Sequence, residues 1–199
     1  MSDSIKQHFI NACYAGEVEK ITACLTLGVN IDCVDKYGET GLMKCAAYND
    51  CDAMEILLNN QPPANINFKT TTNHTALHCA CGNNATRAVT MLCAVPGVQL
   101  NIVNSAGDTP LLLAVANGHI ECIKAMENVP GVEWNVKDRD GNSAIMLALK
   151  KKRRNIVTVM VKFAGVDLDT KDADNNSLEQ VARLVLEGGV KFKNRVWVF

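Results

Sequence analysis

The most constraining feature of the sequence is a hydroxyl residue that recurs at an almost constant interval. Thr40, Thr75, Thr109, Ser143 and Ser177 follow one another at spacings of 35, 34, 34 and 34 residues. Self-similarity at a fixed period of this size predicts a stack of repeated units in which each unit contacts only its neighbours. A chain built this way folds as an elongated array, because each unit buries its apolar face against the next one.

The stretch 104–137 shows best what one unit contains. Gly107 lies where a tight turn requires positive φ, which glycine adopts without a Cβ clash. Thr109 is suited to cap a helix, and Pro110 fits the first helical position, where no backbone donor is needed. Apolar residues then recur three and four positions apart, and a second apolar helical pattern follows Gly118. The sequence therefore predicts two short amphipathic helices per unit.

These residues form a recognisable pattern, G-x-T-P-L-x-x-A followed after three residues by G-H. It is carried by Gly107, Thr109, Pro110, Leu111, Ala114, Gly118 and His119. The pattern resembles the ankyrin repeat, and the resemblance extends in phase over residues 3–187. It implies an all-α fold, an ankyrin-repeat α-solenoid of about six helix-turn-helix units with short β-hairpin tips. The expected units are 3–34, 35–69, 70–103, 104–137, 138–171 and 172–187.

Residues 188–199 are expected to form a C-terminal cap or tail. Val196 to Phe199 is too short a run to predict a strand without a partner in view. The abrupt Trp197-Val198-Phe199 ending suggests an alternative function, in which the chain is a regulatory inhibitor or adaptor fragment of a larger protein.

Composition narrows the functional classes. The formal charge is −1 and aromatic residues make up 5% of the 199 positions, which suits thin helical layers and disfavours nucleic-acid and membrane partners. The N-terminus lacks the apolar stretch of a secretory signal, and no run of about 18 apolar residues predicts a membrane span. Nine cysteines, an odd number, occupy small apolar slots and indicate a reducing compartment. We expect a cytoplasmic monomer, with a nuclear location as the alternative.

Motifs for catalysis are missing from the sequence. It contains no Walker loop, no G-x-G-x-x-G, no H-E-x-x-H and no G-x-S-x-G, so we predict a non-catalytic protein without a cofactor. His78, Cys79 and Cys81 are a poor zinc half-site, because neighbouring helical positions project at different angles. The resemblance instead implies that His78 bonds backbone between neighbouring tips.

The resemblance also implies a binding role, in which a protein or peptide lies on the hairpin tips and the first helices. Carried over unit by unit, the expected partner-binding residues are Lys36, Tyr37, Glu39, Tyr48, His74, Asp108, Asn117, Arg139, Asp140, Lys150 and Lys151. Tyr37 and Tyr48 stand where the pattern demands no core residue. Each is either a binding hot spot or a cover for aliphatic surface beside it.

The run from Lys150 to Arg154 replaces the glycine-containing turn of the other units. Five like charges repel one another unless solvent or a partner screens them. Three interpretations stay open: a contact for an acidic peptide or phosphate, a nuclear-import patch, or a solvated loop.

Overall fold

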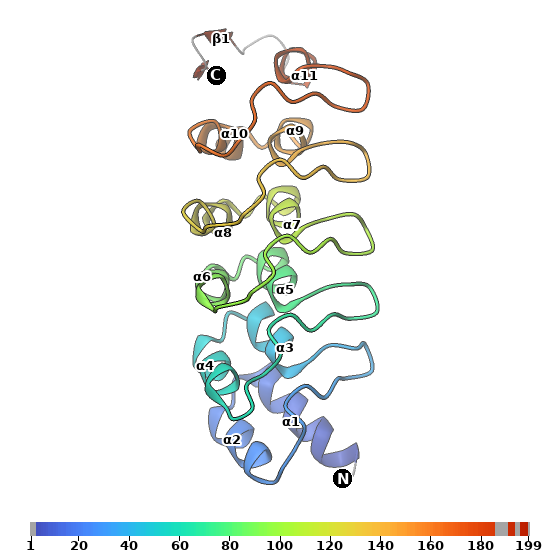
Figure 1. Cartoon of the computed structure of the whole chain (residues 1–199), viewed down its shortest axis with the longest axis vertical. Coiled ribbons are helices and arrows are strands. Elements are labelled where there is room, and N and C mark those ends of the chain that lie inside the picture. The colour runs from blue at the N-terminus through green and yellow to red at the C-terminus, as the bar shows by residue number, and fades with distance from the viewer. Residues whose placement is uncertain (1–2, 186–190, 194–195, 199) are drawn as a thin grey trace.

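The structure, a computed structural model, describes residues 3–185, 191–193 and 196–198. This part of the chain forms an elongated stack of eleven helices with two short strands near its C-terminal end (Figure 1). The helices are α1 Asp3–Ala15, α2 Val18–Thr26, α3 Gly41–Ala47, α4 Cys51–Asn59, α5 Ala76–Gly82, α6 Thr86–Ala94, α7 Pro110–Asn117, α8 Ile120–Ala125, α9 Ala144–Lys150, α10 Arg154–Met160 and α11 Leu178–Val185. The strands are β1 Lys191–Lys193 and β2 Val196–Val198.

The helices form two parallel rows. The odd-numbered helices, here called the first helices, stack on one another beside a column of loops, and the even-numbered second helices stack on the other side (Figure 1). Contacts run from each first helix to the next, from α1 to α11, and from α2 through α4 and α6 to α8. The all-helical solenoid predicted from the sequence is confirmed, while the unit boundaries stay a prediction.

The recurring hydroxyl residue starts the first helices. The side-chain oxygens of Thr40, Thr75 and Thr109 accept the backbone N–H three residues on, at 3.3, 3.4 and 3.2 Å. Such a cap satisfies one of the four backbone donors that the first turn of a helix leaves unpaired. Ser177 makes the same bond to the Gln180 N–H, whereas Ser143 makes no side-chain cap. Pro110 occupies the first turn of α7, as its fixed φ predicts.

The core is a continuous apolar column between the two rows of helices. Small and medium side chains fill most of it, and alanine and cysteine recur along both rows of helices. Leu111, Ala114 and Ile123 of the best-formed unit are all buried. Free cysteine behaves as a small hydrophobe in such a setting, which explains why seven of the nine thiols are buried. One wider section is filled by Trp134 and Phe163, whose rings meet edge-to-face at 5.1 Å.

A second set of contacts joins the units outside the core. Asn67, Asn101 and Asn135 each bridge to the segment one unit ahead. Through Nδ2 they donate to the carbonyls of Gly97, Gly131 and Gly165 at 2.8, 2.7 and 2.9 Å. Through Oδ1 they accept the backbone N–H groups of Gln99, Glu133 and Asp167 at 2.8, 3.0 and 2.8 Å. We call this series the asparagine ladder.

The loops before α3, α5, α7, α9 and α11, here called the tip loops, share one hydrogen-bond pattern. Their first residue donates its N–H to the carbonyl four positions on and accepts the N–H three positions on. In four of them an Asp or Asn at the first position also accepts two loop N–H groups through its side chain. Isolated antiparallel bridges occur at Val34–Thr40 and Lys171–Ser177. The expectation of β-hairpin tips stays a prediction.

The sequence predicted no strand at 196–199 because no partner was in view, and the structure shows one at Val196–Val198. This segment pairs antiparallel with Lys191–Lys193, in the register Lys191 to Val198 and Lys193 to Val196. The partner lies only a few residues earlier in the chain, so a local hairpin supplies the pairing that the isolated run lacked. The 188–199 cap or tail lies partly outside the described residues.

We predict that Asn101→Ala lowers the free energy of unfolding by about 1–2 kcal/mol, because two bonds between units are lost and a glycine carbonyl loses its donor. Urea denaturation measures the change. Asn128→Ala is the matched control, since Asn128 is exposed in the loop after α8 and is expected to leave stability within about 0.5 kcal/mol. Equal losses in both variants would contradict the role given to the ladder.

Candidate protein-binding face

The tip loops lie in a column beside the first helices along the stack (Figure 1). We call these loops together with the exposed residues of the first helices the inner face. All the residues predicted from the sequence to contact a partner lie on these elements or on the turns that end them. The structure brings some of them together and keeps others far apart, and several are already bound to neighbouring units.

The tip loop before α3 carries a compact charged group. Lys44 of α3 places its ammonium 2.9 Å from the Asp35 carboxylate and also pairs with Glu39. Burial opposes ionisation of Asp35, but the Lys44 ammonium and the loop N–H groups outweigh it and lower the pKa of the carboxyl. Glu39 is thus half-buried and engaged inside the protein, while Lys36 and Tyr37 at the tip stay exposed. The Lys36 ammonium lies 4.9 Å from the centre of the Tyr37 ring.

Tyr48 ends α3 and is 57% exposed. Its ring meets that of Tyr14 from α1 edge-to-face, with 4.7 Å between the centroids. Sequence reasoning missed Tyr14, because the first unit lacks the motif that fixes the alignment of the others. Gly16 takes positive φ, as Asn49 does at the equivalent position of the next unit. Counting back two residues from each makes Tyr14 equivalent to Ala47, on the exposed side of the first helix.

Several predicted contact residues serve the stack itself. His74 is half-buried and lies 3.2 Å from the Asn104 amide, and the Arg139 guanidinium donates to the Ser105 carbonyl. The Asn117 amide donates to the Gly82 carbonyl at 3.1 Å. Burial, helped by the nearby Asp138, raises the pKa of the half-buried Asp108. His74, Arg139 and Asn117 therefore have less freedom to bind a partner than the sequence suggests.

The C-terminal part of the inner face carries Asp140, Lys150 and Lys151. Asp140 is exposed in its tip loop, and Lys151 is exposed at the end of α9. Lys150 instead pairs with the Asp172 carboxylate at 3.1 Å. Burial opposes ionisation of Asp172, but the Asn176 N–H and the Lys150 ammonium outweigh it and lower the pKa of the carboxyl. Lys151 and Tyr48 occupy equivalent helix ends several units apart, so no single compact site joins them.

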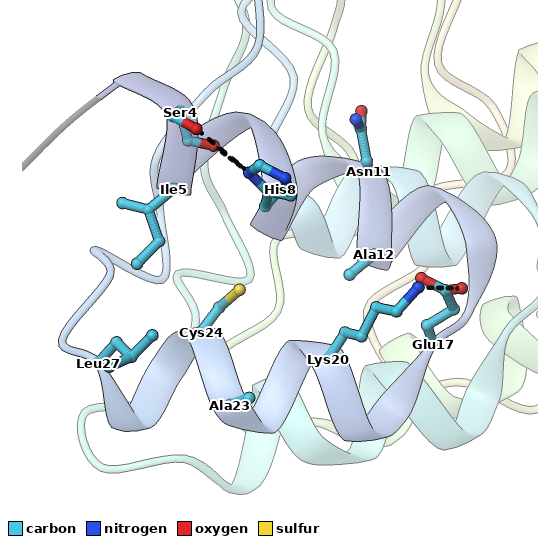
Figure 2. Close-up of a pocket in the computed structure, with 10 residues that line it drawn as sticks. All are labelled: Ser4, Ile5, His8, Asn11, Ala12, Glu17, Lys20, Ala23, Cys24 and Leu27. Carbon is cyan, nitrogen blue, oxygen red and sulfur yellow. Dashed lines mark hydrogen bonds and ion pairs between the residues drawn. The ribbon is translucent and has the colours of Figure 1, made fainter.

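A hollow of about 540 Å³ lies away from the inner face, between α1 and α2 (Figure 2). Lys20 and Glu17 pair across its edge at 2.8 Å, and Leu27 lies exposed at its far end. Lys20 stands where the next units place the fully buried Ala53 and Ala88. The hollow is the end face of the first helix pair, equivalent to the face of α3 and α4 that α1 and α2 cover. We therefore give it no binding role.

The described residues contain no group of three or more His, Cys, Asp or Glu side chains placed to hold a metal ion. Within the same part of the chain, no helix is long and apolar enough to cross a bilayer. Burial raises the pKa of the Cys79 thiol to about 12 and that of Cys93 to about 11, which leaves both as thiols near neutral pH.

Comparison with known families agrees with this architecture. The family model described as ankyrin repeats in three copies matches residues 9–104 and 94–172. The chain belongs to the ankyrin-repeat family. A search of curated proteins gave no match. Ankyrin repeats are generally protein–protein interaction modules and are typically non-catalytic.

Alignment of the repeats also shows which structural position each residue of the run from Lys150 to Arg154 occupies. The turn between the paired helices needs one residue with positive φ, and the residues in this slot are Gly16, Asn49, Asn84, Gly118 and Lys152. Lys152 takes the slot at φ +57° although it carries a Cβ. Arg153 takes the position of His119, and its guanidinium donates to the Ala116 carbonyl at 3.3 Å. With Lys150 paired as well, Lys151, Lys152 and Arg154 are the exposed remainder of the run.

His78 has the structural role that the resemblance implies. Its ring lies against the Thr75 cap, with Nδ1 2.9 Å from the Thr75 hydroxyl, and Nε2 approaches the Asp108 carbonyl of the next tip loop at 3.2 Å. The side chain is almost fully buried. Burial lowers the pKa of His78 to about 4 from its ordinary value of 6.5, so the ring is neutral at physiological pH.

We predict that Lys152→Gly raises the free energy of unfolding by up to about 1 kcal/mol, because glycine removes the strain of a side chain at positive φ. Lys151→Gly removes the same charge at φ −82°, where glycine only adds flexibility to the unfolded chain, and should lower stability by about 0.5–1 kcal/mol. Thermal and urea unfolding compare the two. Equal changes in the free energy of unfolding would show that the effect comes from the lost charge, and would contradict the strain inferred at Lys152.

The neutral His78 also predicts an acid-sensitive fold. A histidine whose pKa falls from 6.5 to about 4 on folding stabilises the protein fully above pH 6.5 and loses that contribution as the pH falls to 4. The loss amounts to about 3 kcal/mol. Met43 and Met146 fill the same slot in two other units and are buried there. His78→Met should therefore lose less stability than the wild type between pH 7 and pH 4.5, as measured by urea denaturation. Parallel losses in the two proteins would contradict this origin.

Proposed function

We propose that the protein is a non-catalytic interaction module that binds a protein or peptide partner along its inner face. The supporting observation is the contrast between a uniformly buried core and an inner face whose exposed residues differ from unit to unit. Tyr37 and Tyr48 are exposed toward its N-terminal end, and Asp140 and Lys151 toward its C-terminal end. Rigid presentation of such a face lowers the ordering cost of association.

The middle of the inner face favours close approach of a partner backbone. Ala47, Gly82 and Ala116 occupy equivalent positions near the ends of α3, α5 and α7, and all three are half-buried. A Cβ added at Gly82 would meet no atom within 4 Å, so this position opens onto free space. Small side chains at these positions would let an extended chain approach the first helices closely.

We further propose that the protein acts in a reducing compartment, the cytosol or the nucleus. All nine cysteines are free thiols, and seven of them are buried. Disulfides persist mainly in oxidising compartments. A chain that packs free cysteines in its hydrophobic core therefore suits a reducing compartment.

Affinity purification from cells that express the protein, read out by quantitative mass spectrometry, tests the binding face. Gly82→Gln places a helix-forming side chain in the open space at Gly82, and Tyr48→Ala removes an exposed ring. We expect each variant to lose at least tenfold in recovery of a specific partner. Thr90→Gln and Leu27→Ala are matched controls, because both residues are exposed and lie off the inner face. Recovery of every partner at the wild-type level with both inner-face variants would contradict the placement.

A further inference from the structure

The three tyrosines of the chain gather at one end of the inner face. Tyr14, Tyr37 and Tyr48 come from α1, the first tip loop and the end of α3, and are 53%, 66% and 57% exposed. Tyr14 and Tyr37 line the same groove, of about 420 Å³, and Tyr48 packs against Tyr14 beside it. Exposed aromatic rings gathered around a groove mark a recognition surface more often than scattered ones do.

The framework around these rings is fixed before any partner arrives. Tyr14 belongs to α1, which packs on α3, and the edge-to-face contact with Tyr48 orients both rings. The Tyr37 N–H donates to the Asp35 carboxylate at 2.8 Å, and the Lys36 and Lys44 ammonium groups lie 4.9 and 5.8 Å from its ring centre. The contact between the Tyr14 and Tyr48 rings leaves these two side chains less freedom to lose on binding, which favours affinity.

The residues that line the groove favour one of the conformations in which peptides usually bind to proteins. Besides the two tyrosines, its lining includes one aliphatic residue, Ile10, beside the polar Gln7, Asn11 and Lys44. An amphipathic helix needs a broad aliphatic groove for its anchors, and strand addition needs a free sheet edge. Neither is present in the described residues around the groove. A polyproline II segment needs flat aromatic faces for its proline rings and donors for its unpaired carbonyls, and tyrosine supplies both.

The charged groups at the rim of the groove add a requirement for the sequence of the peptide. Lys44 is compensated by Asp35 and Glu39, whereas Lys36 on the same rim makes no ion pair with a carboxylate in the described part of the chain. Lys36 is therefore the ammonium group in the groove lining that has no carboxylate partner of its own and can pair with an acidic residue of a peptide. We propose that the groove between Tyr14 and Tyr37 binds a proline-rich peptide segment that carries an acidic residue for Lys36. This inference rests on the proposed binding role of the inner face and names the chemistry of its partner.

A random dodecapeptide phage library, panned on the full chain, tests the inference without a known partner. We expect the selected peptides to be enriched in prolines spaced by about two residues, with Asp or Glu beside them. A synthetic peptide of the consensus sequence should then bind at least tenfold more weakly to Tyr14→Ala and to Tyr37→Ala. Lys36→Glu should weaken binding of the acidic peptide several-fold and leave an otherwise identical peptide with Gln in place of the acid unaffected.

The controls separate this inference from the general binding role. Leu27→Ala removes an equally exposed apolar side chain outside the groove and should leave affinity unchanged, and circular dichroism checks that each variant folds. Selected peptides without proline, or binding that survives both tyrosine variants but is lost in Gly82→Gln, would overturn the inference and leave the binding role standing. Failure to select any peptide that depends on an inner-face residue would contradict both.

Discussion

The structure depends on side-chain amides that bond the backbone of the neighbouring unit. At three consecutive steps of the stack, the asparagine ladder supplies one bond to a glycine carbonyl and one from a backbone N–H. Apolar packing alone does not fix the register of one helix pair on the next, because it is not directional. A bidentate amide is directional, so it holds consecutive units at one spacing. His78 performs a related task at the tips, where it joins its own cap to the next loop.

This arrangement separates the residues that hold the stack from those that face a partner. Glu39, His74, Arg139 and Lys150 have ionisable or polar groups on the surface, yet each is bound to another part of the protein. Such bonds make the inner face rigid and leave these groups less available to bind a partner. What remains is an aromatic cluster at one end, small residues in the middle and exposed charges at the other end.

Much of the fold was predictable from sequence, because the same pattern recurs in several units and each copy supports the same interpretation. Thr109-Pro110 and the paired apolar faces predict the helix pairs correctly, and Gly107 takes positive φ as expected. The engagement of Lys150 with Asp172 was not predictable, since it depends on which side chains one unit turns toward the next. The role of Tyr14 was hidden for another reason: the first unit lacks the alignment motif, and only the backbone conformation of Gly16 restores its position.

Hydrogen exchange at single backbone amides tests the central claim most directly. The N–H groups of Gln99, Glu133 and Asp167 lie on exposed residues in loops, yet each is bound to a ladder asparagine one unit away. If the ladder fixes the register of the stack, these amides exchange as slowly as those within the neighbouring helices. Exchange at the rate of unprotected loop amides, with the helices still protected, would show that packing alone holds the units together and would contradict the account.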